Sequence, residues 1–463
     1  MMLPASVLHS SFTCSVKFCG ASSPRSIILS PAAITKHLLR VTLCLCASVV
    51  LLSFISISAN AQRIATLQLT TKGTEKYLIP VQTNLDAITF VADSVLQLTE
   101  ITGGRKVMIP YQIETGNGRV MHWLVQPSKN KKRVFELSKT AVIRPTPVMQ
   151  ANLIDGELVL SAGKKSLLQY NYKTVYPPKG VDTAYKRSGF IHPLNTPNGQ
   201  SLTRIQAPDH YHHYGLWNPW TRVLFEKDTV DFWNLKDRKG TVRFSGFGGV
   251  YAGDVFSGYT ALHDHIAFQK NGIEKIAINE IQTIKIYDPG GNSNYYFMDF
   301  TVQLSCASSS PVKLLEYRYG GIGVRATELW DRNNSMTLTS EGKDRKGADG
   351  STARWCLAQG QLGNDYGGLV MMSYPANYNH PEPLRVWPES ANNRGDVFIN
   401  FSPTKNKDWL LEPGKSYILK YRFLIFNDKI AGPEAEEVWQ NFAKPPLIWI
   451  LNNGGTKAQR SAK

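Results

Sequence analysis

Residues 255–305 contain three long runs that favour β-strands: VFSGYTALHDHIAF (Val255–Phe268), IEKIAINEIQTIKIY (Ile273–Tyr287) and YYFMDFTVQLS (Tyr295–Ser305). Such runs fit the pleated surface of a sheet. Further predicted strands lie on both sides, at Gly215–Phe225, Thr241–Val250, Val312–Tyr319, Met336–Thr339, Ala353–Leu357, Gly368–Ser373, Val397–Phe401 and Tyr417–Phe426. Because no helices alternate with these strands, the pattern excludes doubly wound and TIM folds and predicts an all-β protein.

The domain organisation follows from strand length. So many long antiparallel strands predict two large packed sheets, which we place at residues 166–430. Shorter alternating runs with glycine-rich turns predict a smaller N-terminal β-sandwich-like module at residues 62–165. The one convincing helix is Pro433–Phe442, which starts with a proline and acidic residues, so residues 431–463 form a C-terminal helix and tail.

The first 61 residues have the layout of a leader with a signal peptide. Lys36 and Arg40 precede an apolar h-region at Val41–Ile57, and Ala59-Asn60-Ala61 is an A-x-A cleavage site. Cleavage near Ala61 predicts a secreted or periplasmic protein with no membrane span after processing. An uncleaved membrane anchor is the alternative.

The net charge and the cysteine content limit the kinds of binding partner and of covalent cross-link to expect. The formal net charge is +16, yet the longest basic run is Lys131-Lys132-Arg133, so we predict no nucleic-acid partner. The surplus favours acidic polysaccharides or a generally basic surface. Outside the leader, Cys306 and Cys356 remain, and a disulfide or two free thiols both stay open.

A cluster of titratable residues marks the expected site. His192 and Asp209-His210-Tyr211-His212-His213 lie in a stretch rich in proline and glycine, and Trp217, Trp220 and Trp233 follow. Imidazole can act as an acid, a base or a metal ligand near neutral pH, and sugars stack on tryptophan faces. The stretch predicts an active or binding site, with a hydrogen-bonded structural cluster as the alternative.

These residues also carry a family resemblance. H-P-L-x-x-P-x-G-x-x-L-T-R at residues 192–204 is followed by P-D-H-x-H-H-x-G-L-W-x-x-W at 208–220 and by D-F-W at 231–233. The motif resembles the secreted bacterial family labelled "methane oxygenase PmoA", from roughly Tyr170 to Phe426. Residues 411–417, LEPGKSY, resemble the closing strands of galactose-mutarotase-like supersandwiches. This second resemblance implies a concave sheet that holds a sugar among His, Arg, Trp and carboxylate side chains, and the first family's label hints at copper.

Three further groups complete the candidates. Glu316 and Arg318 would share one strand face, and Arg325 follows a glycine run, so these side chains would line the sheet or form a structural ion pair. Trp355 lies on another predicted strand, which would either contribute to the binding site or be an ordinary strand. His263-Asp264-His265 has the H-x-H spacing of metal sites, with an ordinary solvated strand as the alternative.

We therefore expect a carbohydrate or glycan ligand, bound either by an epimerase, lyase or glycoside-cleaving enzyme or by a non-catalytic glycan-binding protein. The catalytic candidates are His210, His213, Asp209 and Glu316, and the substrate-binding candidates are His192, Arg204, His212, Trp217, Trp220, Arg318, Arg325 and Trp355. No cofactor is predicted. A third hypothesis is a transition-metal site built on His210 and His212 with His192 or Asp209. Against it, the adjacent His212 and His213 should point to opposite sides of an extended backbone.

Overall fold

The computed structural model describes residues 61–140, 147–288, 290, 293–452 and 455–459. The expected leader, with its h-region at 41–57, therefore lies outside the described residues apart from Ala61. Within the described ranges, no helix combines the length and apolar character needed to cross a membrane.

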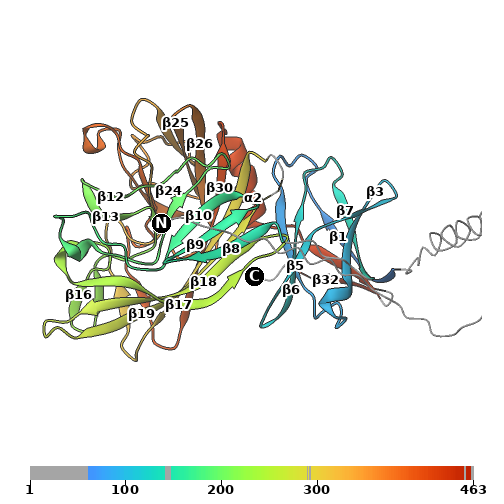
Figure 1. Ribbon diagram of the computed structural model, residues 1–463, viewed down its shortest axis with the longest axis horizontal. Helices are drawn as coiled ribbons and strands as arrows, with labels where there is room; N and C mark the ends of the chain where they lie inside the picture. Colours follow the sequence, from blue (N-terminus) through green and yellow to red (C-terminus); the bar gives the residue numbers. More distant parts are fainter. Residues whose placement is uncertain (1–60, 141–146, 289, 291–292, 453–454, 460–463) are drawn as a thin grey trace, which may run out of the picture. The chain divides into compact units, whose positions relative to one another are not determined.

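Two large antiparallel sheets form the main part of the chain and confirm the all-β architecture (Figure 1). The first has eight strands, in the order β17 (Gly240–Tyr251), β18 (Ser257–Phe268), β19 (Glu274–Tyr287), β20 (Tyr295–Cys306), β30 (Ser416–Asn427), β26 (Asp365–Ser373), β25 (Trp355–Leu362) and β23 (Ser335–Thr339). The second has nine, in the order β24 (Thr352–Ala353), β27 (Glu382–Val386), β28 (Phe398–Phe401), β22 (Gly323–Arg325), β14 (Leu216–Trp217), β11 (Phe190–Leu194), β10 (Lys165–Asn171), β9 (Glu157–Ala162) and β8 (Met149–Ile154).

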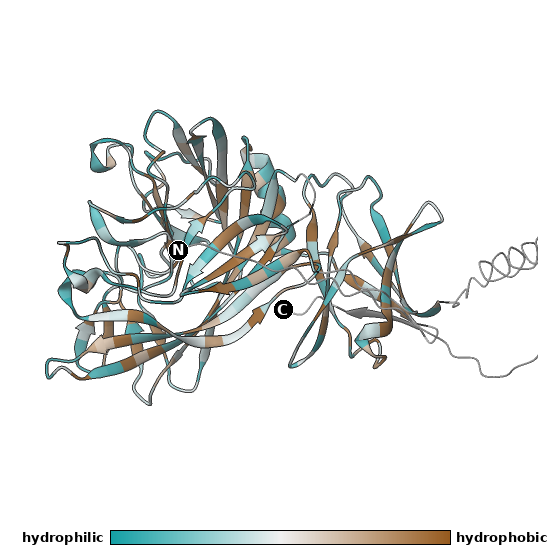
Figure 2. Cartoon of the chain, viewed as in Figure 1, coloured by the Kyte–Doolittle hydropathy of each residue, from teal (hydrophilic) through white to brown (hydrophobic). Residues whose placement is uncertain are grey.

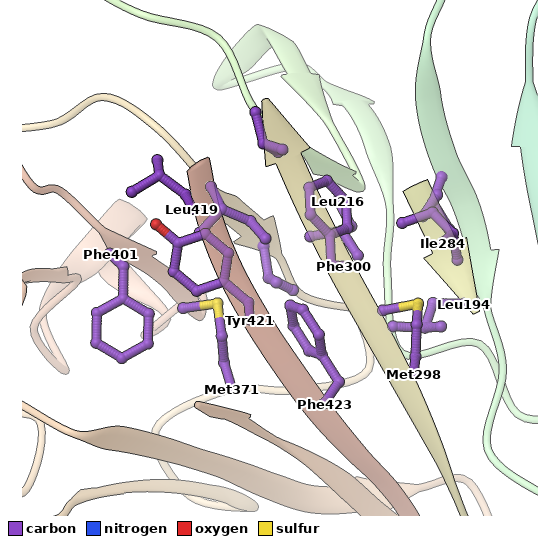
Figure 3. Packing of buried hydrophobic residues seen from close by; sticks show 14 of the residues in the cluster. Leu194, Leu216, Ile284, Met298, Phe300, Met371, Phe401, Leu419, Tyr421 and Phe423 are labelled. Carbon is purple, nitrogen blue, oxygen red and sulfur yellow. The ribbon is translucent and has the colours of Figure 1, made fainter. Parts of the chain in front are cut away.

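The core lies between these sheets. Leu194 and Leu216, from the side of the nine-stranded sheet, pack near Met298, Phe300 and Phe423 of the eight-stranded sheet (Figure 3). Apolar residues, coloured brown in Figure 2, recur along the strands of both sheets. Each such side chain stabilises the fold by about 1.5–3 kcal/mol when fully buried, so this core holds the scaffold of the site in place.

Cys306 and Cys356 are free thiols. They lie on β20 and β25, which are separated by two other strands of the eight-stranded sheet. The disulfide alternative is therefore wrong, and the sheets are held by packing and backbone hydrogen bonds.

Two predicted strands are shorter than expected. The run Gly215–Phe225 divides into β14 and β15 (Val223–Phe225), which belong to different sheets. Pro219 lies between them and has no backbone N–H for a ladder. The run Val312–Tyr319 ends as a strand at Leu314 in β21 (Val312–Leu314), so Glu316 and Arg318 follow it in irregular backbone. β15 and β21 pair within a small sheet with β16 (Asp228–Val230) and β29 (Trp409–Leu411).

The N-terminal module has two sheets and its own apolar core. One sheet contains β31 (Ile448–Asn452), β32 (Gly455–Gln459), β1 (Gln62–Thr70), β7 (Lys132–Lys139), β3 (Leu96–Thr102) and β4 (Arg105–Met108), and the other contains β2 (Ile79–Asn84), β6 (Gly118–Val125) and β5 (Tyr111–Gly116). The strand pairing crosses the domain boundaries that the sequence predicted, after residue 165 and before residue 431. β8 pairs with β9 and β9 pairs with β10 in the nine-stranded sheet, and β31 pairs with β1 because Ile448 and Ile450 are buried in the module's core. The helix α2 (Gly432–Ala443) forms where the sequence predicts one.

A buried carboxylate makes stability depend on pH. Glu382 of β27 is fully buried and accepts hydrogen bonds from Ser373, Asn377 and Tyr421. Burial raises the pKa of Glu382 to about 7. The folded state therefore holds this proton at pH values where the unfolded chain has lost it, and the stability it contributes is lost as pH rises from about 4.5 through 7.

We expect Glu382→Gln to remove this decline. At about 1.4 kcal/mol for each unit of pKa shift, the wild type should lose up to about 3 kcal/mol relative to the variant between pH 4.5 and 8. Urea unfolding of both proteins at pH 5 and pH 8 measures the difference. Parallel pH profiles for the two proteins would contradict the assignment.

Candidate functional site

A bulged hairpin brings three histidines together. β12 (Ile205–Ala207) pairs with β13 (His210–Tyr214), with Ile205 opposite Tyr214 and Ala207 opposite His210 (Figure 1). Gln206 alone therefore faces three residues of β13, and its φ is 49°. Such a bulge breaks the strict alternation of side chains along a strand. As a result, one ring nitrogen each of His210, His212 and His213 lies within 4.8 Å of the others. The expectation that the adjacent His212 and His213 point to opposite sides is therefore wrong.

His213 is the buried member of this cluster. Its ring is 3% exposed and lies 5.0 Å from Phe398 and 5.1 Å from Trp217, between ring centroids. Burial lowers its pKa well below the usual value, with the neighbouring cations adding to the effect. Burial also lowers the pKa of His212 to about 3. Both rings are therefore neutral at pH 7, and the expected role of His213 as a catalytic acid does not fit this environment.

Asp209 holds His210 in place. Nδ1 of His210 donates to Oδ2 of Asp209 at 2.7 Å, and Asn392 donates to the same oxygen at 2.8 Å. Partial burial acts to raise the pKa of Asp209, but the hydrogen bond from His210 and the Arg325 guanidinium outweigh it and hold the pKa well below its usual value. Asp209 is therefore ionised, and its hydrogen bond orients the His210 ring, as predicted. A carboxylate in this position is found beside histidines that act as acid or base and beside histidines that bind a metal.

Two arginines and a second carboxylate lock this arrangement. Nη2 of Arg325 donates to Asp209 at 3.0 Å and to Asp396 at 2.8 Å. Nη2 of Arg204 reaches the same two carboxylates at 3.2 and 2.9 Å. The Arg325 guanidinium is fully buried and lies 4.5 Å from the ring centroid of Trp387. These arginines, expected to bind substrate, therefore bind carboxylates of the protein itself.

A small pocket opens beside the cluster, and we call it the histidine pocket. Its volume is about 100 Å³. It is lined by His210, His212, His213, Trp233, Asn234, Arg318, Tyr319, Arg385, Trp387 and Phe398. The walls thus combine aromatic faces with imidazole, amide and guanidinium groups. Trp217 lies behind His213 and does not line the pocket itself.

Four predicted site residues lie elsewhere. Trp220 is buried in the main core against Trp409. Trp355 donates its indole N–H to Glu436 at 2.7 Å, beneath α2. His192 shares a 3.0 Å hydrogen bond with Thr203, and Glu316 is exposed beyond the end of β21, with its backbone N–H donating to Asp408. None of these four lines the histidine pocket, so their predicted catalytic or binding roles there are not supported by position.

Several residues of the site were missed by the sequence reasoning. Those that line the pocket are Asn234, Tyr319, Arg385, Trp387 and Phe398, and those in the hydrogen-bond network around Asp209 and Arg325 are Asn392 and Asp396. Most come from residues 385–398, which β27 and β28 bring beside β22. The sequence alone does not indicate which strands become neighbours.

The H-x-H pair is structural. His263 and His265 both share hydrogen bonds with Glu280, at 3.0 and 2.9 Å, and all three side chains are buried. Asn218 donates to the same carboxylate, and Tyr170 contacts His263. The rings do share one face of β18, as predicted, but that face points into the core, so the solvated-strand alternative is wrong.

Comparisons with known proteins place the chain in a family. A family model described as a family of unknown function, DUF6807, matches residues 157–440. The chain belongs to this family. No curated protein matches the chain. Among solved structures, heparan sulfate lyase HepC from Pedobacter heparinus is similar over 70% of this chain and 43% of that chain, at 9% identity and a TM-score of 0.29. The chain thus spans less than half the length of that protein. The DUF6807 match covers the histidine pocket and every strand of the two large sheets except β8, and its description names no activity.

Proposed function

We propose that this DUF6807 protein binds a carbohydrate in the histidine pocket and transforms it there. The observation that carries the proposal is that His210, held by Asp209, lies beside the aromatic rings of Tyr319 and Trp387 in one pocket. Sugar rings stack on such faces, while hydroxyl groups bond to imidazole, amide and guanidinium groups. The reacting atoms of the sugar would lie against His210, whose side chain is one-third exposed (33%).

The size of the pocket favours one sugar unit. Its volume of about 100 Å³ is small beside the roughly 300–1,000 Å³ of pockets that take drug-sized ligands. A single ring at the end of a chain, or a monosaccharide, fits this space better than an extended oligosaccharide. Epimerisation, elimination and glycoside cleavage all act on one such unit and stay within the proposal.

The charge of the pocket favours an acidic sugar. Arg385 is paired with Asp349 at 2.6 Å, whereas no carboxylate in the described part of the chain lies within salt-bridge distance of Arg318. The exposed Arg318 guanidinium lies over the rings of Tyr317 and Tyr319. A guanidinium presented on an aromatic platform suits a ligand carboxylate or sulfate.

We expect Arg318→Ala to weaken binding of an acidic monosaccharide by about 10- to 100-fold, because a hydrogen bond to a charged group contributes roughly 1.5–3 kcal/mol. Calorimetry with uronic acids and neutral hexoses, on purified protein, measures the effect. Arg222→Ala is the matched control, since Arg222 is also exposed and also lies 5.7 Å from the Tyr317 ring, but does not line the pocket. Equal affinities for the two variants, or no saccharide binding at all, would sink the proposal.

A second candidate is a non-catalytic glycan-binding protein. The low pKa of His212 and the burial of His213 favour it, because neither ring changes charge between pH 5 and 8. Binding that stays flat over this range, with no product formed from any bound saccharide, would select this candidate.

Two finer assignments belong to the same proposal. The signal-peptide layout of residues 1–61 supports action in the periplasm or outside the cell. The motif at residues 192–233 supports kinship with the group labelled methane oxygenase PmoA.

A further inference from the structure

The strongest unassigned feature is the convergence of three imidazoles on one point. His210, His212 and His213 each offer a ring nitrogen, and these nitrogens all lie within 4.8 Å of one another. Ring centroids are 4.7–5.3 Å apart within the trio. Zn–N bonds are about 2.0–2.1 Å long, so nitrogens bound to one ion lie roughly 3–3.5 Å apart. The three rings must therefore move closer together for all three nitrogens to bind one ion.

The buried ring of the trio has an unused nitrogen. Nδ1 of His213 is buried and makes no hydrogen bond within the described residues, although the ring is only 3% exposed. A buried polar atom with no partner costs about 1–3 kcal/mol, so the fold retains it only with some compensation. A metal ion bound through this nitrogen would supply that compensation, because imidazole binds metals in its neutral form.

The surroundings of His210 match those of a metal ligand. Its Nδ1–H donates to Asp209 at 2.7 Å, which leaves Nε2 as the coordinating atom. Metal-bound imidazoles usually give their second N–H to a carboxylate in this way. Arg325 and Asn392 donate hydrogen bonds to Asp209 and fix its position. Through Asp209 they also fix the orientation of the His210 ring.

We propose that His210, His212 and His213 form a three-histidine centre for a divalent transition metal, of which Zn²⁺ is the reference ion. Three protein nitrogens leave at least one coordination position open, as in catalytic rather than structural zinc sites. The trio lines the histidine pocket, so the open position faces the space assigned to substrate. Only this catalytic reading rests on the proposed function; metal binding itself does not.

The test is a titration of chelator-treated, full-length protein with Zn²⁺ alone. Calorimetry and elemental analysis should give one ion per chain. His210→Ala and His212→Ala should each weaken Zn²⁺ binding by at least about 100-fold, and Asp209→Asn by about 10- to 100-fold. His192→Ala is the matched control, because this half-buried histidine belongs to the same sequence motif but lies outside the trio. Its Zn²⁺ affinity should equal that of the wild type.

Thermal unfolding separates loss of ligand from loss of fold. Zn²⁺ should raise the melting temperature of the wild type and of His192→Ala but not of His210→Ala, whose side chain is one-third exposed and whose metal-free form should melt like the metal-free wild type. Wild-type affinity no stronger than that of His210→Ala would overturn the proposal. Saccharide binding is measured in parallel on the chelated protein. If the protein binds saccharide but not Zn²⁺, the metal centre is refuted and the proposed function is not. If it binds Zn²⁺ but not saccharide, the proposed function is refuted and the metal centre is not.

Discussion

Replacing Arg325 with alanine is expected to lower the free energy of unfolding by about 3–5 kcal/mol. The guanidinium is fully buried and bonds to Asp209 and Asp396, of which Asp396 is itself buried. Removing one partner of a buried ion pair leaves an uncompensated charge in a poorly solvated place, which accounts for the size of the loss. Trp387 also loses the cation that it covers. Urea unfolding at pH 7 measures the change.

The control for this experiment is Arg243→Ala. Arg243 pairs with Glu274, and both side chains are 47% exposed, so we expect a loss below about 1 kcal/mol. The double variant Arg325→Met with Asp396→Asn should recover part of the stability, because it removes the second charge together with the first. A loss in Arg325→Ala no larger than in Arg243→Ala would show that Arg325 is free to bind ligand, as the sequence predicted.

Replacing Glu280 with alanine is expected to cost about 4 kcal/mol, with a pH dependence opposite to that of Glu382. The variant leaves N–H groups of His263, His265 and Asn218 without their buried acceptor, at roughly 1–3 kcal/mol for each unsatisfied group. Burial acts to raise the pKa of Glu280, but the two imidazoles outweigh it and lower the pKa far below its usual value. Its stabilising contribution is therefore present above pH 4.5, the ordinary value for glutamate, and is lost as pH falls below it.

Unfolding curves at pH 3.5 and pH 7 test both parts of this prediction. The difference between wild type and Glu280→Ala should be larger at pH 7. Glu274→Ala, an exposed carboxylate on the same strand, provides the reference and should change stability by less than about 1 kcal/mol at either pH. A difference that grows in acid would refute the depressed pKa.

Strand positions were predictable from the sequence where apolar residues recur regularly along a whole strand. β19 and β20 match the predicted runs Ile273–Tyr287 and Tyr295–Ser305 to within one residue at either end. Where a proline or an early strand end interrupts the pattern, as at Pro219 and after Leu314, local composition did not show which sheet the next residues join.

The centre of the site was predictable for a different reason. Asp209, His210 and His213 are too polar and too densely placed for core packing to explain, and the structure does bring them together. Their partners were not predictable, because Asp396 and Trp387 reach them only through the pairing of β27 with β28 and of β28 with β22. The bulge opposite Gln206 was equally hidden, since a left-handed glutamine has no sequence signature comparable to that of glycine.

The pairing of β1 with β31 sets an order of assembly during synthesis. Leu69 lies opposite Ile448, so β1 finds one of its two neighbours only after the strands of both large sheets have been synthesised. Until then the edge of β1 is unpaired, and the apolar core of its module lacks Ile448 and Ile450. Closing so long a loop is slow, because its entropy must be lost before the contacts form. The N-terminal module therefore completes its core only after the strands of both large sheets have been made.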